Sequence, residues 1–530
     1  MAEDEAAHES GRGADHSRHH LHLPERVRRL RALRVLPPNR RGSLAERRLR
    51  RPGAPGPASE HVIQYLVSNT LRARKDNPSA NAIGIKQADF FYRDQYRQYL
   101  STVAGAFAMT APQALVASGT AARGLAWRRH RRTVAALVEG APDAPPILVL
   151  DRGTVAVAVL LPREGSDEDR LVAGDRVVGA PGTVRERDPD GALVETVRAA
   201  VASGRLAILA LHPHDPDAMG LHITLFGVTL LGAAELQADH ALTATDLAAH
   251  SAAADAAGRR LAFLVGGTEE VFTQCSQNLF VKHPVTPGET AGDPHDPAQR
   301  DWPRRPLAEF LAAQFEALQV TVGHDGLPGA SPRNGDIGRA AFVETRRGRT
   351  HVLIPYHPGN AIHGHAAKLW TNPYSSVVCS DDHSARRRVT LSGRSWIADQ
   401  AVVARRFPAT SAAVLQPEGP DGPSVPEPVY WFVMRLDDVV WERGTLAANR
   451  LDPGRAACTI NAGGQGRHTK KPGYFAADTV DRYDLHLQHE RERAGRPVDP
   501  DGTDRRAWTE AVTSDLQARR DHLATVATGA

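Results

Sequence analysis

Histidine and carboxylate side chains gather in one stretch of the sequence, residues 351–383. This stretch holds five histidines and is predicted to run strand, loop, helix, strand, loop. A His-Pro-His sequence also follows the predicted strand 206–211 directly. Neutral imidazole and carboxylate are donors that Zn²⁺, Mn²⁺ or Fe²⁺ take in proteins. We therefore expect a divalent metal site whose ligands come from a pool larger than one ion needs: His212, His214, His357, His363, His365, Asp382 and His383.

A metal ion held by these residues predicts a hydrolase. A bound divalent ion lowers the pKa of its water to about 7 and so supplies a nucleophile. Asp381 is then expected as a general base or as a partner that orients a metal ligand, and Lys368, one turn after His365, is expected to face an anionic substrate. Backbone amides at glycine-rich turns also hold anions, which adds the predicted substrate-binding residues Gly359, Asn360, Gly464, Arg467 and Lys470. The main hypothesis is metal-assisted hydrolysis of a small polar or anionic substrate.

Other interpretations of the same residues remain open. Cys379 ends a predicted strand four residues before His383, so a group-transfer enzyme with a cysteine nucleophile and no metal is one alternative. A non-enzymatic nucleic-acid-binding or regulatory protein, which would use the basic leader and a helix from Arg123 to Arg132, is another. The structural alternative is that the loop histidines cap helices and satisfy backbone groups, while the cysteine is simply buried in a strand.

A short motif elsewhere resembles part of a known enzyme class. His222-Ile223-Thr224 has the His-X-Thr form found in two-histidine phosphoesterases. Those enzymes need two copies of the motif, and the chain has no convincing second copy.

Short apolar runs define the elements that must position these residues. Because helical patterns alternate with the strands, we expect an α/β fold with a mixed, partly parallel sheet flanked by helices. No repeat at a fixed period is found. Strands are predicted at 147–150, 155–161, 206–211, 261–265, 351–355, 376–379, 388–391 and 430–436, and helices at 191–203, 244–260, 307–318 and 508–523.

Composition divides the chain into six regions. Proline-rich and polar stretches separate segments that carry apolar periodicity. The expected regions are a disordered Arg/His/Pro-rich leader at 1–58, a helical N-terminal region at 59–145, an α/β region at 146–284, a Pro-rich connection at 285–306, an α/β region with the histidine cluster at 307–490, and a polar C-terminal helix at 491–530.

The basic charge is confined to the leader. Residues 1–57 hold 13 arginines and seven acidic residues and are therefore +6, so the remaining residues of a chain with formal charge +4 carry −2. Nucleic acid is thus expected as a partner only through this leader, and a small molecule is the expected partner of the rest. The oligomeric state cannot be predicted from these features.

The compartment follows from cysteine usage and hydropathy. Three cysteines in 530 residues cannot form a disulfide framework and suit a reducing compartment. The uncharged segment 101–122 is mostly Ala, Ser, Thr and Gly, so we expect a buried helix there rather than a membrane span, followed by a solvated basic helix near 123–132. The sequence therefore predicts a soluble, cytoplasmic protein.

Overall fold

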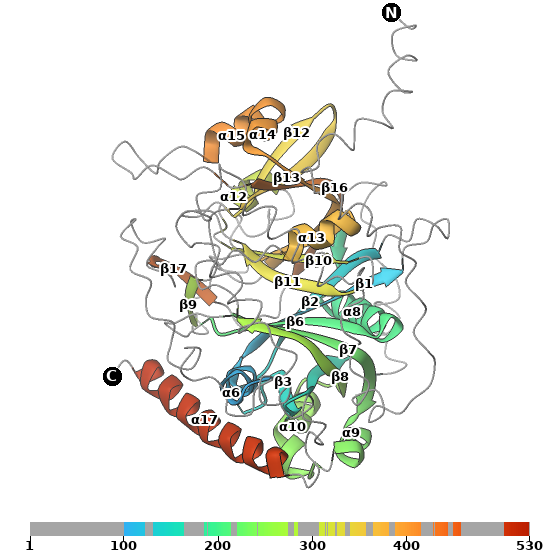
Figure 1. Ribbon diagram of the computed structural model, residues 1–530, viewed down its shortest axis with the longest axis vertical. Coiled ribbons are helices and arrows are strands. Elements are labelled where there is room, and N and C mark those ends of the chain that lie inside the picture. The colour runs from blue at the N-terminus through green and yellow to red at the C-terminus, as the bar shows by residue number, and fades with distance from the viewer. Residues whose placement is uncertain are drawn as a thin grey trace, which may run out of the picture.

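The computed structural model describes twelve stretches of the chain, with gaps of one or two residues inside some of them. They are residues 100–121, 131–163, 185–213, 220–273, 280–284, 307–333, 340–356, 364–380, 387–414, 428–443, 449–456 and 503–528. The described chain forms two large antiparallel sheets with short helices against them (Figure 1).

The N-terminal half is built around a seven-stranded sheet in the order β2-β1-β6-β7-β8-β4-β3. Its strands are β1 (Gln113–Ala121), β2 (Arg131–Glu139), β3 (Ile147–Asp151), β4 (Thr154–Leu161), β6 (Arg205–Leu211), β7 (Gly220–Gly232) and β8 (Arg260–Thr273). Its helices are α6 (Thr102–Thr110), α8 (Pro189–Ser203), α9 (Ala233–His240), η4 (Thr245–Leu247) and α10 (Ala248–Ala256).

The C-terminal half is built around a second sheet, in the order β11-β10-β14-β15-β16-β13-β12. Its strands are β10 (Ala317–Val322), β11 (Pro328–Arg333), β12 (Phe342–Arg346), β13 (Arg349–Tyr356), β14 (Tyr374–Ser380), β15 (Arg387–Ala398) and β16 (Tyr430–Arg443). Its helices are α12 (Leu307–Ala312), α13 (Gly364–Thr371), α14 (Gln400–Arg406) and α15 (Pro408–Val414).

The two halves have the same topology. Replacing β1, β2, β3, β4, β6, β7 and β8 by β10, β11, β12, β13, β14, β15 and β16 converts one strand order into the other. The helices follow the same plan, since α6 and α12 precede the first strand of each half, and α8 and α13 precede β6 and β14. The equivalent short strands β9 (Phe280–Pro284) and β17 (Asn449–Ala456) pair with each other. The chain is therefore a structural duplication, which the search for a repeat in the sequence does not detect.

The duplication extends to an irregularity in the strand pairing. In β7 and β8, Thr224 lies opposite Glu270, and the next pair skips one residue of β8. In β15 and β16, Ser392 lies opposite Asp438, and the next pair skips one residue of β16. A β-bulge at the same place in both sheets fixes the residue equivalence: Thr224 matches Ser392, and Glu270 matches Asp438.

An apolar cluster joins the two halves. It contains equivalent residues of both sheets, among them Leu115 and Leu318, and Ala135 and Ala330. Strand β6 shows the consequence, because Leu206, Ile208 and Ala210 face the core of its own half while the residues between them belong to the joining cluster. The halves therefore share a continuous apolar interior.

The expected α/β fold with a partly parallel sheet is wrong. Both sheets are antiparallel, and among the described strands only the three-residue β5 (Arg185–Arg187) pairs in parallel, with β16. A continuous apolar run such as 206–211 is typical of parallel strands, which are buried on both faces. Here β6 is buried on both faces because the second half covers the outer one.

The individual elements were predicted better than their pairing. All eight predicted strands and the helices at 191–203 and 508–523 are present. The helical prediction for 59–145 and the basic helix expected near 123–132 differ from the structure at two places, because β1 and β2 are strands. The helix expected at 307–318 ends at Ala312, and β10 follows.

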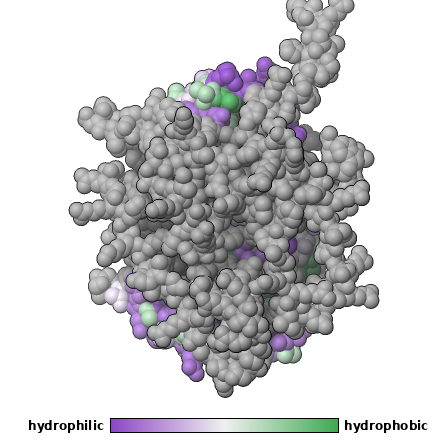
Figure 2. Space-filling model, in the orientation of Figure 1, coloured by the Kyte–Doolittle hydropathy of each residue, from purple (hydrophilic) through white to green (hydrophobic). Residues whose placement is uncertain are grey.

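The C-terminal helix α17 (Thr503–Thr528) packs against α6, the first helix of the N-terminal half. Trp508 and Val512 join the core of that half beside Gly105, and the guanidinium of Arg519 lies 5.2 Å from the Phe107 ring centroid. The visible surface of α17 is mostly hydrophilic (Figure 2). In the described part of the chain, no helix is both long and apolar enough to cross a membrane.

Candidate ligand site between the two halves

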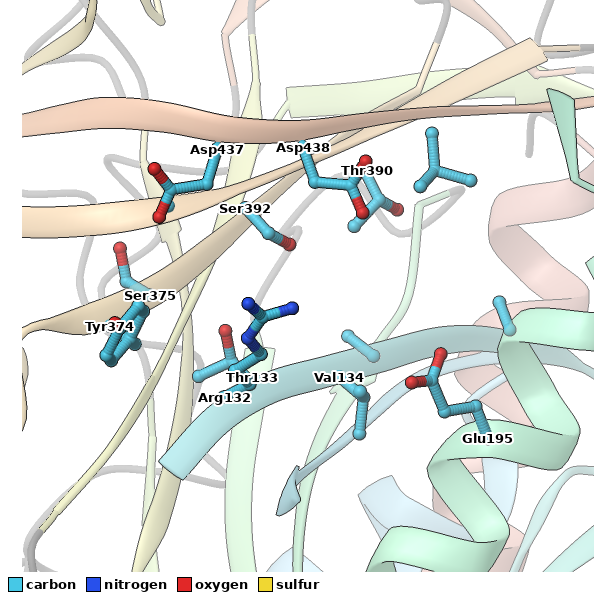
Figure 3. Close-up of a pocket in the computed structure, with 14 residues that line it drawn as sticks. Arg132, Thr133, Val134, Glu195, Tyr374, Ser375, Thr390, Ser392, Asp437 and Asp438 are labelled. Atoms are coloured by element: carbon cyan, nitrogen blue, oxygen red, sulfur yellow. The ribbon is translucent and has the colours of Figure 1, made fainter. Parts of the chain in front are cut away.

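A pocket of about 230 Å³ lies between the two halves (Figure 3). Strand β2 and helix α8 of the N-terminal half form one side, and strands β14, β15 and β16 of the C-terminal half form the other. We call this contact the pocket interface. Its described lining residues are Arg132, Thr133, Val134, Ala135, Ala192, Glu195, Tyr374, Ser375, Thr390, Ser392, Gly393, Asp437, Asp438 and Val440.

The lining is polar and carries more negative than positive charge. Glu195, Asp437 and Asp438 contribute three carboxylates, and Arg132 contributes the one guanidinium among the described lining residues. Figure 3 shows Arg132 extending from β2 toward the strands that carry Ser392 and Asp438. Such a lining favours a ligand with positive charge and several hydrogen-bonding groups.

Hydroxyl groups hold the two sides of the pocket together. Thr133 Oγ1 on β2 is hydrogen-bonded to Ser376 Oγ on β14. Ser376 Oγ also donates to the Thr133 carbonyl oxygen (3.2 Å) and lies 2.8 Å from Ser392 Oγ. This network fixes β2 against the C-terminal sheet, so the pocket is largely preformed.

The duplication places an equivalent contact elsewhere in the molecule, between β11 and α13 of the C-terminal half and β7 and β8 of the N-terminal half. We call it the histidine interface, because His222 on β7 crosses it. His222 Nδ1 donates to the Ala330 carbonyl oxygen on β11 (3.0 Å), and Nε2 is 2.9 Å from Thr224 Oγ1. Thr224 Oγ1 in turn donates to Glu270 Oε2 (3.3 Å).

The pocket interface and the histidine interface differ at one equivalent position. The bulge register makes Thr390 of the pocket interface the equivalent of His222. A threonine is too short to reach the neighbouring strand as the imidazole does, and Thr390 Oγ1 is buried without a hydrogen-bond partner among the described residues. The pocket thus occupies the place that a histidine side chain takes at the other interface.

His212, a predicted metal ligand, has a structural role instead. Its side chain is 4% exposed, and its Nε2 lies 3.1 Å from the Phe107 carbonyl oxygen and 3.2 Å from Thr110 Oγ1, at the end of α6. Its ring packs against Phe107. This arrangement matches the structural alternative, in which a histidine satisfies backbone groups at a helix end.

His365 and Lys368, both predicted site residues, lie on one face of α13. His365 Nδ1 is 2.9 Å from Thr321 Oγ1. Burial, followed by the nearby charges of Arg333 and Lys368, lowers the pKa of His365 well below its ordinary value. The imidazole is therefore neutral near pH 7, beside two cations.

Cys379 is a core residue of the C-terminal half. It is 1% exposed in β14 and packs with other apolar residues. A thiol buried in apolar surroundings is commonly inert. Its position favours the structural alternative over a nucleophile.

The remaining predicted site residues all lie outside the described residues, so their positions remain predictions. These are His214, His357, Gly359, Asn360, His363, Asp381, Asp382, His383, Gly464, Arg467 and Lys470.

The geometry of the described residues corrects the prediction of a metal site. Within the described ranges, no group of three or more His, Cys, Asp or Glu side chains is placed to hold a metal ion. The two described members of the predicted ligand pool, His212 and His365, bond to different partners in different halves. Proximity to strand ends suggests convergence, but neighbouring antiparallel strands end at opposite ends of a sheet, so His212 and His365 need not meet.

Sequence reasoning does not identify the residues around the pocket as a site. Arg132 was assigned to a solvated helix, and Asp437-Asp438 received no role. A signal is present in the sequence, because this acidic pair and Arg435 interrupt the otherwise apolar run from Tyr430 to Trp441. The pair Glu269-Glu270 interrupts β8 in the same way.

Comparisons with known proteins do not identify a family. No family model and no curated protein sequence matches the chain. Among solved structures, HupZ of Group A Streptococcus is 11% identical, with 25% of this chain and 88% of that chain covered and a TM-score of 0.18. HutZ, the heme storage protein from Vibrio cholerae, is 19% identical, covering 26% and 90% with a TM-score of 0.15. General Stress Protein 26 from Bacillus anthracis is 12% identical, covering 25% and 88% with a TM-score of 0.15. Similarities of this size support no conclusion about function.

Proposed function

We propose that this protein binds a small, positively charged organic molecule in the pocket between its halves. The observation that supports this is a preformed cavity whose described lining has three carboxylates against one guanidinium. Ligand sites concentrate at contacts between domains, and typical pockets span roughly 300–1,000 Å³. A cavity of about 230 Å³ lies just below that range and suits a small ligand.

Hydroxyl groups add a second requirement for the ligand. Tyr374, Thr390 and Ser392 line the cavity beside the carboxylates. A linear diamine or polyamine, with ammonium groups spaced by methylenes, would pair with the carboxylates and pack against Val134 and Val440. A neutral sugar would offer no opposite charge to the carboxylates of the lining.

The test is a binding titration of the full chain with putrescine and spermidine, using glucose as a neutral comparison. We expect the amines to raise the melting temperature and glucose to have no effect. Asp438→Asn removes one carboxylate with little change of shape and should weaken amine binding about tenfold, since a charge-assisted hydrogen bond contributes roughly 1.5–3 kcal/mol.

Two further variants sharpen this test. Thr390→His copies the side chain that closes the equivalent contact and should abolish amine binding while the chain stays folded. Asp255→Asn removes an exposed carboxylate on α10, away from the pocket lining, and should bind like the wild type. Amine binding that survives both Asp438→Asn and Thr390→His would contradict the proposed site.

A further inference from the structure

Two buried cations of the C-terminal half lie on α13 and at the end of β11. Lys368 is 3% exposed and Arg333, at the end of β11, is 6% exposed. In the described part of the chain, neither side chain forms an ion pair with a carboxylate. Burying a charge without a counter-charge is strongly unfavourable, so this arrangement calls for a partner.

Arg333 is held in place by neutral groups. Its Nε donates to Gln319 Oε1 (2.9 Å), and its Nη1 donates to the Pro332 carbonyl oxygen (3.3 Å). The guanidinium also lies over two aromatic rings, 5.5 Å from the Tyr356 centroid and 5.4 Å from the Phe432 centroid. These contacts orient the guanidinium without neutralising it.

Lys368 is less constrained than Arg333. Its side chain runs along the backbone of β11, so that a Cβ added to Gly329 would lie 3.4 Å from Lys368 Nζ. The ammonium end of Lys368 is therefore held close to β11. Among the described residues, no acceptor lies within hydrogen-bonding distance of the ammonium, which leaves it available to a ligand.

His365 completes the group one turn before Lys368. Its imidazole is kept neutral by burial and by the two cations, and Thr321 engages its Nδ1. Nε2 is then left for a ligand. The carboxylate that acts on His365 from the other half is Glu270, which faces His222 and Thr224 instead.

We propose that Lys368, Arg333 and His365 form a binding site for an oxyanion, the phosphate or carboxylate group of a small molecule. The ammonium and guanidinium supply the charge, and the imidazole supplies a further hydrogen bond. This site lies beside the histidine interface, so it is distinct from the pocket and does not depend on the function proposed there. Its ligand has the opposite charge.

The test uses the full chain with inorganic phosphate and with succinate, each against chloride at matched ionic strength. Melting temperature and isothermal titration are the two measurements. Phosphate that stabilises the wild type supports a phosphate site, and succinate that stabilises it supports a carboxylate site. No stabilisation by either anion overturns the proposal.

Substitutions test whether anion stabilisation arises at Lys368. Lys368→Met keeps the length of the side chain and removes its charge, so it should raise the melting temperature in anion-free buffer and weaken anion binding at least about tenfold. Lys368→Gln serves the same purpose if the methionine variant does not fold. Arg394→Gln removes an exposed cation on β15 and should behave like the wild type. Anion stabilisation that persists in both Lys368 variants overturns the proposal, because it would then arise elsewhere.

Because organic cations test the pocket and oxyanions test this site, either proposal can fail without the other.

Discussion

At the histidine interface, His222 spans the distance from β7 to β11 and binds the Ala330 carbonyl oxygen. At the pocket interface, Thr390 holds the equivalent position and leaves a cavity of about 230 Å³. The two places have equivalent strands, an equivalent bulge and an acidic residue beside it, Glu270 in one and Asp438 in the other. The comparison shows that, in a duplicated fold, the size of a single side chain can close one contact between the halves and leave a cavity at the equivalent contact.

The largest effect on the free energy of unfolding is expected from substitutions at the two equivalent positions, His222 and Thr390. His222→Leu removes the imidazole that faces Glu270, whose side chain is 1% exposed, and should lower the free energy of unfolding by about 3 kcal/mol. Thr390→Val replaces a buried hydroxyl that has no partner among the described residues, and should leave stability unchanged or raise it by about 1 kcal/mol. Urea unfolding of both variants measures the difference.

A double variant checks the cause of the His222 effect. His222→Leu with Glu270→Leu removes both polar partners and should recover most of the lost stability, because apolar pairs replace buried polar pairs at little cost. Similar losses for His222→Leu and Thr390→Val would mean that the two interfaces contribute equally, contrary to the comparison.

The bulge in β15 and a second irregularity in β7, between Phe226 and Thr229, should also respond differently to a methyl group. A Cβ at Gly393 would overlap the carbonyl oxygen of Arg435, and backbone atoms cannot move aside cheaply, so Gly393→Ala should cost about 3 kcal/mol. Gly227 in the equivalent strand β7 has φ of 62° and open space around it, so Gly227→Ala should cost about 1 kcal/mol from backbone strain alone. Urea midpoints of the two variants provide the measurement, and equal losses would show that the β15 bulge relaxes.

The smallest expected effect concerns pH. Burial and the charges of Arg333, Lys368 and His222 lower the folded-state pKa of His365, while Glu270 opposes them. Below an ordinary histidine pKa of about 6.5 the unfolded chain therefore binds a proton that the folded chain does not, and stability falls as pH falls, by at most about 1.4 kcal/mol per pH unit.

His365→Asn removes this contribution, so the variant should lose less stability than the wild type between pH 7.5 and pH 5.5. The pKa of His351 is also lowered, chiefly by burial, and this background is common to both proteins. Chemical unfolding at each pH gives the comparison. Identical pH profiles would place His365 in contact with solvent and weaken the case for a buried oxyanion site.

Much of the local structure could be predicted from the sequence, whereas the pairing of the strands could not. The run from Leu206 to Leu211 identifies a strand buried on both faces. A helix layer and a second sheet bury a strand equally well, so the run does not say which of them covers it. The duplication was equally hidden, because equivalent positions hold different residues, as His222 and Thr390 illustrate.

The candidate site could be predicted only in part. Sequence reasoning names His365 because histidine is clustered there and Lys368 because it follows His365 by one turn, and the structure does bring them together on α13. It does not name Arg132 and Asp438, since they are 306 positions apart and meet only through the contact between halves. No local pattern carries that information.

The helix α17 sets the order in which the protein can mature during its synthesis. Trp508 and Val512 complete the core that α6 begins, yet they follow the end of α6 by almost 400 residues. At roughly 5–20 residues per second on the ribosome, the N-terminal half waits about 20–80 seconds for its last packing partner. A nascent chain therefore exposes the apolar face of α6 for most of its translation, which makes that face a natural contact for a chaperone until the final helix emerges.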